Sequence, residues 1–207
     1  MARLLYVQAS PRCSRSKAIQ VADAFVEAYK AKHPSDTVEV FNVFTADLPA
    51  FDGDAVQGKY NIMHGKLHSA REKHVWDGVL KVIDHFKSAD KYLFAIPMWN
   101  FGIPYRLKQY IDVIVQPGQT FAVTDKGYEG LVKGKPVAVV YARGGTYTGP
   151  AESYDQQKRY VEQILGFIGF TAIESIVVEP TLHGTPEAIE VMVEQRRRDA
   201  RRLAETF

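Results

Sequence analysis

The sequence predicts an α/β protein built on a doubly wound parallel sheet of about five strands with helices on both faces. Several short runs are apolar throughout instead of alternating, which is typical of strands buried on both faces of a parallel sheet. Segments with apolar residues at helical spacing separate these runs along the chain. Ligands of such sheets bind beyond the carboxyl ends of the strands, so the loops that follow the strands are where function is expected.

The first half of the chain supplies two strand and helix pairs. Residues 4–7 form a continuous apolar run, and residues 18–29 carry apolar side chains at helical spacing. Residues 37–42 predict a weaker strand. A long polar stretch around residues 53–73 leads into a second helical pattern at residues 75–86. These segments predict two strand–helix units in succession.

The second half continues the alternation. Residues 92–96, 137–141 and 173–178 are rich in β-branched and aromatic residues and predict three more strands. Residues 160–168 carry an apolar stripe at helical spacing. Thr185 followed by Pro186 is typical of an N-cap and first turn, which predicts a last helix.

Composition and charge narrow the class of protein. The chain has 207 residues, 46% of them hydrophobic, and a formal net charge of +2. We therefore expect one domain over residues 1–207 that binds neither nucleic acid nor membranes. The basic residues at 196–202 have acidic neighbours, as on an exposed salt-bridged helix. The lack of a signal-peptide pattern and the single cysteine predict a cytoplasmic location.

The loop after the first predicted strand is rich in hydroxyl groups and cations. Its sequence from residue 10 to 17 is Ser-Pro-Arg-Cys-Ser-Arg-Ser-Lys, and a helix follows. The free N–H groups at the start of a helix favour a phosphate, so this loop predicts a phosphate-binding site. The alternative is an ordinary helix cap with incidental Ser and Arg residues.

Three other phosphate motifs do not fit. A dinucleotide fingerprint needs glycines in the first loop, but the first glycine of the chain is Gly53. None of the Gly-Lys pairs is followed by Ser or Thr, as a Walker-type loop requires. A phosphatase that used Cys13 would need an arginine six residues on, where this chain has Ile19.

The loop at residues 96–104 reads Ile-Pro-Met-Trp-Asn-Phe-Gly-Ile-Pro. Its prolines stiffen the backbone, and Met98, Trp99 and Phe101 offer apolar surface around Asn100. A flat aromatic ligand would suit that surface. The alternative is a hydrophobic loop that plugs the end of the sheet. Three large apolar side chains on a loop need cover, which a ligand, a second subunit or both could supply.

The loop after the strand at 137–141 begins Ala142-Arg143-Gly144-Gly145. Two glycines let main-chain N–H groups approach a ligand with no Cβ in the way, although a simple turn explains them equally well. His64, His68 and His74 lie in a polar segment without a metal-binding motif, so we expect no metal.

Taken together, these loops make the chain resemble the FMN-dependent NADH:quinone oxidoreductases, also called azoreductases, which have a flavodoxin-like fold. The resemblance covers essentially the whole chain. It is carried by residues 10–18, by residues 97–104 with Leu107 and Lys108, and by residues 127–131 leading to residues 143–145.

The resemblance implies a role for each loop in binding FMN. The phosphate would be held by Ser10, Ser16, Lys17 and Ala18, and the isoalloxazine would be lined by Met98, Trp99, Asn100 and Phe101. The polar edge of the ring would meet Ala142, Arg143, Gly144 and Gly145. The family often has Ser where this chain has Ala18 and Ala142, and Tyr where it has Trp99, so some hydroxyl contacts would be absent.

The implied reaction carries two electrons from NADH or NADPH through FMN to quinones or azo compounds by a ping-pong mechanism, and the flavin does the chemistry. No side chain is assigned as a catalytic acid, base or nucleophile. Phe101, Phe121 and Tyr128 are candidate walls for an aromatic substrate, although ordinary packing explains the last two equally well. Family members are dimers, which implies a homodimer here. The physiological acceptor and the choice between NADH and NADPH stay open.

Two other functions fit the same fold. A flavodoxin-type electron carrier would bind FMN without turnover of its own, but such carriers are usually strongly acidic and this chain is not. A sensor or interaction domain without a cofactor is the other alternative, because a fold does not fix a function.

Overall fold

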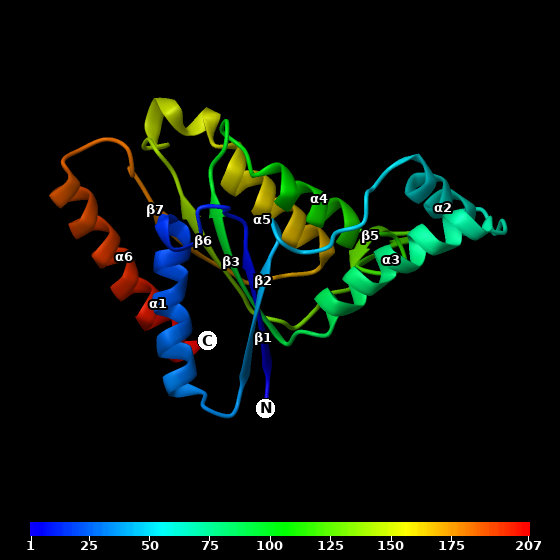
Figure 1. Cartoon of the computed structure of the whole chain (residues 1–207), viewed down its shortest axis with the longest axis horizontal. Helices are drawn as coiled ribbons and strands as arrows, with labels where there is room; N and C mark the ends of the chain where they lie inside the picture. Colours follow the sequence, from blue (N-terminus) through cyan, green and yellow to red (C-terminus); the bar gives the residue numbers. More distant parts are fainter.

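A five-stranded parallel sheet forms the centre of the molecule, with the strand order β2-β1-β3-β6-β7 (Figure 1). The computed structural model describes all 207 residues. The strands of the sheet are β1 (Arg3–Gln8), β2 (Thr37–Asn42), β3 (Lys91–Pro97), β6 (Val137–Ala142) and β7 (Ile173–Val178). The five predicted strands and their parallel arrangement are confirmed.

Helices cover both faces of this sheet, as predicted. On one face α1 and α6 lie side by side, and on the other lie α3, α4 and α5 (Figure 1). Their bounds are α1 (Lys17–Lys32), α3 (Ala70–Lys87), α4 (Tyr105–Ile114), α5 (Gln156–Ile168) and α6 (Pro186–Thr206).

Strand β1 shows why its apolar run is continuous. Leu4 and Tyr6 pack into the core that α1 and α6 cover, whereas Leu5 and Val7 pack into the core under α3, α4 and α5. Side chains alternate between the two faces of a strand, and here both faces are buried. The four side chains are at most 1% exposed.

The segment expected to be a long polar stretch holds a helix. Helix α2 (Gly53–Met63) begins at Asp52, whose carboxylate accepts hydrogen bonds from the Asp54 and Ala55 amides. Helix α3 begins earlier than the predicted residue 75, because Ser69 and Glu72 form a capping box. The two helices form a hairpin that extends away from the sheet (Figure 1).

Four further short elements complete the fold. The strands β4 (Phe121–Thr124) and β5 (Gly127–Gly130) pair as an antiparallel hairpin that the sequence did not predict. Two 3₁₀ turns, η1 (Cys13–Arg15) and η2 (Gly149–Tyr154), lie in the loops after β1 and β6. None of the helices combines the length and apolar character needed to cross a membrane.

The connections of the sheet place the switch point beside β1. The chain runs from β1 to β2 on one side and then crosses to β3 on the other side of β1. In sheets of this order the ligand crevice lies at the carboxyl ends of these strands. The loops after β1, β3 and β6 therefore define the place to look for a site.

Candidate functional site

The three predicted loops meet at one edge of the sheet. Strands β1, β3 and β6 are parallel neighbours, so their carboxyl ends lie together. The Ala9 amide donates to the Ala95 carbonyl at 3.0 Å, and the Met98 amide donates to the Ala142 carbonyl at 2.8 Å. These bonds join the first loop to β3 and the second loop to the end of β6, where the third loop begins.

The start of α1 presents unused hydrogen-bond donors. Ser16 is the N-cap residue, yet its side chain makes no capping hydrogen bond. The amides of Lys17, Ala18 and Ile19 also have no partner within the chain. Ser16 and Ser10 are nearly buried, at 3% and 1% exposed. An uncapped helix start with buried hydroxyl groups beside it is a ready site for an anion.

The side chains of residues 17 and 18 point away from this site. The Lys17 ammonium forms an ion pair with Glu190 of α6 at 3.1 Å. The Ala18 side chain is fully buried in the core between α1 and the sheet. What these two residues offer a ligand is therefore their amides.

Positive charge surrounds the same loop. The chain forms sixteen ion pairs, and neither Arg12 nor Arg15 takes part in any of them. Cys13 is exposed and lies between them with a positive φ of 49°. The donors and the free guanidinium groups together favour a phosphate over a neutral ligand.

The second loop contains a tight two-residue turn. The Trp99 amide donates to the Gly102 carbonyl at 3.1 Å, and the Gly102 amide donates to the Trp99 carbonyl at 2.9 Å. Asn100 and Phe101 between them have φ values of 48° and 67°. Positive φ at both central residues fits a type I′ turn. In such turns Gly is common at the second central position, which Phe101 occupies here. A phenylalanine in the left-handed region is strained, and such strain collects at functional sites.

This turn also carries two amides without a partner in the chain, those of Asn100 and Phe101. Aromatic rings flank them on both sides. Trp99 packs against Phe44 and Tyr105, with ring centroids 5.8 and 6.2 Å away. Phe101 packs in the same way against Tyr147 and Tyr154. The turn thus presents two polar N–H groups and an amide side chain between two apolar walls.

The third loop turns its carbonyls to one side and its amides to the other. The Arg143 carbonyl accepts from the Thr181 amide at 2.9 Å, and the Gly144 carbonyl accepts from the Leu182 amide at 3.0 Å. The amides of Gly144 and Gly145 have no partner. A Cβ at position 144 would lie 2.8 Å from the Leu182 side chain, so glycine suits the close approach of these two loops.

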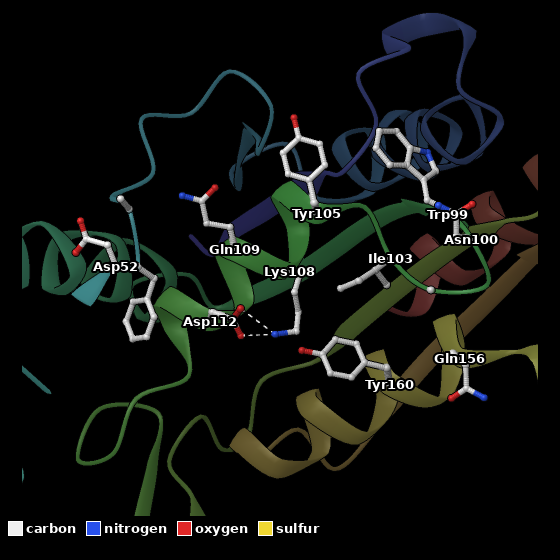
Figure 2. A pocket seen from close by; sticks show the side chains of 13 residues that line it. Asp52, Trp99, Asn100, Ile103, Tyr105, Lys108, Gln109, Asp112, Gln156 and Tyr160 are labelled. Carbon is white, nitrogen blue, oxygen red and sulfur yellow. Dashed lines mark hydrogen bonds and ion pairs between the residues drawn. The ribbon is translucent and has the colours of Figure 1, made fainter. Parts of the chain in front are cut away.

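A cavity of about 1040 Å³ lies beside the second loop. Figure 2 shows Trp99 and Asn100 at one end of it, with α4 supplying Tyr105, Lys108 and Asp112, and α5 supplying Tyr160. The cavity is lined by Ala50, Phe51, Asp52, Trp99, Asn100, Gly102, Ile103, Tyr105, Lys108, Gln109, Asp112, Gln156 and Tyr160. Of the twelve predicted site residues, only Trp99 and Asn100 line it.

The polar groups of this cavity are largely neutralised or protonated. Lys108 pairs with Asp112, with N–O distances of 2.6 and 2.8 Å. Burial, with Asp112 nearby, raises the pKa of Tyr160 to about 12. Its hydroxyl therefore keeps its proton at neutral pH. The cavity suits a flat, mainly apolar group better than a strongly charged one.

Some residues that shape the site were not predicted from the sequence. Phe44, Tyr147 and Tyr154 complete the aromatic walls, and Asp155 and Glu179 hold the Arg143 side chain. Only Asp155 carried a readable signal, as the N-cap of α5. No group of three or more His, Cys, Asp or Glu side chains is arranged to hold a metal ion.

Comparisons with known proteins agree with this arrangement. Residues 2–203 match a family described by its flavodoxin-like fold. An FMN-dependent NADH:quinone oxidoreductase of Nitratidesulfovibrio vulgaris is 53% identical, and the alignment covers the whole of both chains.

Two solved structures are also similar. The azoreductase from Bacillus anthracis str. Sterne has a TM-score of 0.93 and 32% identity over the whole of both chains. An FMN-dependent NADH-azoreductase from Bacillus anthracis str. Ames Ancestor, solved in complex with FMN, has a TM-score of 0.87 and 27% identity, and covers 99% of this chain and 100% of its own.

These findings place the chain first among the flavodoxin-like proteins. Within that class, it belongs to the family of FMN-dependent NADH:quinone oxidoreductases, which are enzymes. The resemblance noted from the loop sequences is confirmed.

Proposed function

We propose that the chain binds FMN at the meeting point of the three loops and uses it to pass electrons from NADH to quinones and azo compounds. One observation carries this proposal. The start of α1, the Asn100–Phe101 turn and the Gly144–Gly145 loop each present main-chain N–H groups that have no partner in the chain. These N–H groups need acceptors from outside the chain, and three sets of them at one sheet edge fit a ligand rich in acceptor oxygens and nitrogens.

The donor set fits each part of FMN. The α1 amides, with the Ser10 and Ser16 hydroxyls, would hold the phosphate. Met98, Trp99, Asn100 and Phe101 would line the isoalloxazine. The amides of Gly144 and Gly145 would donate to the carbonyl oxygens of its pyrimidine edge. The buried Ala18 and Ala142 side chains face the core, so only their main-chain atoms are available.

When bound at this site, FMN would supply two-electron redox chemistry, in which NADH, a proton from solvent and a quinone give NAD⁺ and a hydroquinone. The protein's own groups bind and orient. Donors aimed at the pyrimidine edge stabilise negative charge that develops there, which is the role we assign to the Gly144 and Gly145 amides. The aromatic side chains beside the cavity would offer one flat surface to NADH and to the acceptor in turn, as a ping-pong order requires.

We propose that residues 1–207 act as one FMN-binding domain in the cytoplasm, and that two copies associate. The support for a dimer is the exposed apolar surface beside the cavity. Trp99, Phe101, Tyr105 and Tyr154 are 38–66% exposed there. Surface of this kind on a loop and the adjoining helix is typical of an interaction site. A second copy packed against α4 would cover it and complete the site.

Matched variants test the dimer. Tyr105→Glu places a charge on this surface, and we expect light scattering to show a shift from dimer to monomer. Val191→Glu places the same charge on α6, across the sheet, where Val191 is 72% exposed. We expect that variant to keep the wild-type mass. A monomeric wild-type protein with flavin bound would contradict the proposed assembly.

The reaction is tested by initial rates. NADH oxidation in the presence of benzoquinone should require FMN, and double-reciprocal plots at several quinone concentrations should be parallel. Intersecting lines would contradict the ping-pong order. A protein that binds FMN but shows no turnover with benzoquinone or an azo dye would be an electron carrier instead.

A further inference from the structure

The side chain of Arg143 lies beneath the Gly144–Gly145 loop, where it points into the protein instead of toward the loop edge. It is 3% exposed. Its guanidinium donates to Asp155 at 2.6 Å, to Gln157 at 3.1 Å and to Glu179 at 3.3 Å. One buried cation thus meets three acceptors from the start of α5 and the end of β7.

The start of α5 also holds the end of β3 and the Trp99–Gly102 turn. The Gln157 side chain accepts from Arg143 and donates to the Ile96 carbonyl at 3.0 Å. The Gln156 amide donates to the Phe101 carbonyl at 3.1 Å. The first turn of α5 therefore contacts main-chain carbonyls of β3 and of the second loop, and it contacts the third loop through the Arg143 side chain.

Glu179 fixes the far end of the third loop. Its carboxylate accepts from Arg143 and from the Tyr147 amide, both at 3.3 Å. Thr181, two residues later, donates from its amide and its hydroxyl to the Arg143 carbonyl. These contacts hold the loop's carbonyls on one side, which is what leaves the Gly144 and Gly145 amides free on the other.

We propose that Arg143 is a positioning residue of the flavin site: held by Asp155, Gln157 and Glu179, it sets the Ala142–Gly145 loop against the Trp99–Gly102 turn. This inference rests on the proposed function for its consequence in catalysis. An arginine suits the task because its planar fork offers five donors in a fixed geometry, whereas a lysine carries its donors on one atom. Because Arg143 and its carboxylate partners are buried, a change of geometry that leaves one of these charges without a partner is costly, which ties the loop to one position.

The test compares Arg143→Lys with Arg3→Lys. Arg3 also donates to a carboxylate, that of Glu39, but it lies at the amino end of β1, away from the site. Hydrogen exchange would be followed at the amides of Met98, Gln156, Thr181 and Leu182, which join the loops. We expect Arg143→Lys to speed exchange at these amides by about tenfold or more and to leave the amides of β1 unchanged. Arg3→Lys should not change the loop amides.

A second measurement connects the loops to flavin. Because the Gly144 and Gly145 amides can donate to the flavin only where the loop holds them, we expect Arg143→Lys to weaken FMN binding by about tenfold or more, measured by flavin fluorescence. Glu179→Gln preserves the shape of the network and should produce smaller changes of the same kind. It also serves if Arg143→Lys does not fold.

The outcomes separate the two proposals. Exchange that rises evenly over the chain, or loop amides that do not respond in either variant, would overturn the positioning role. A wild-type protein that fails to bind FMN would overturn the proposed function, and the exchange data would still decide whether Arg143 positions the loops.

Discussion

Replacing Ser16 with alanine should separate ligand binding from folding. An N-cap serine normally stabilises its helix, and its loss costs about 1 kcal/mol. Ser16 makes no such capping bond here, so its hydroxyl contributes little to the free energy of unfolding of the flavin-free protein. If that hydroxyl binds the FMN phosphate, a hydrogen bond to a charged group worth roughly 1.5–3 kcal/mol is lost.

That loss corresponds to a dissociation constant for FMN that rises roughly 10-fold to 150-fold. The matched control is Thr185→Ala, because the Thr185 hydroxyl does cap α6 by accepting from the Ala188 amide at 3.2 Å. We expect the control to lower the free energy of unfolding by about 1 kcal/mol with no change in FMN affinity. FMN titration and urea unfolding measure both quantities. A Ser16→Ala protein that loses stability and keeps its FMN affinity would refute the reasoning.

Three other predictions concern the turn, the scaffold and acid stability. Phe101→Gly should leave the thermal stability of the flavin-free protein nearly unchanged, because relief of the left-handed backbone by about 1 kcal/mol offsets the lost ring contacts. The affinity for FMN should fall. A large loss of thermal stability would contradict this reasoning. Gly130→Ala should destabilise the protein by roughly 1–3 kcal/mol or more in urea unfolding, because its Cβ would lie 2.3 Å from the Gly169 nitrogen; an unchanged unfolding midpoint would contradict the close contact. Hydrogen bonding from His85 lowers the pKa of Glu39 below its ordinary value of 4.5. The stabilisation from the Glu39 carboxylate is therefore present above pH 4.5 and lost as the pH falls through the lowered pKa. The difference in the free energy of unfolding between wild type and Glu39→Gln should shrink in acid. A difference that grows in acid would contradict the Glu39–His85 interaction.

The sheet was predictable because burial on both faces leaves a signal in every strand. The runs at residues 4–7 and 92–96 are apolar throughout, and the structure buries both. Helix α2 was missed because its sequence is polar and its start depends on the single cap residue Asp52. The β4–β5 hairpin was missed because each strand has only four residues and little apolar pattern.

The main chain of the site was easier to foresee than its side chains. Glycines and a stiff aromatic loop after predicted strands indicate where the main chain can expose unpaired amides, and the structure brings those loops together. The partners of Arg143 could not be foreseen in this way. Asp155 and Glu179 lie 12 and 36 residues away in the sequence, and no local pattern marks two carboxylates that meet one buried arginine.

In the proposed reaction, one site takes electrons from NADH and gives them to a quinone through bound FMN. Anaerobic titration of the FMN-loaded protein measures the two halves of this reaction separately. We expect one equivalent of NADH to bleach the flavin absorbance and one equivalent of benzoquinone to restore it. Flavin that NADH does not bleach, or bleached flavin that the quinone does not reoxidise, would contradict the proposed reaction.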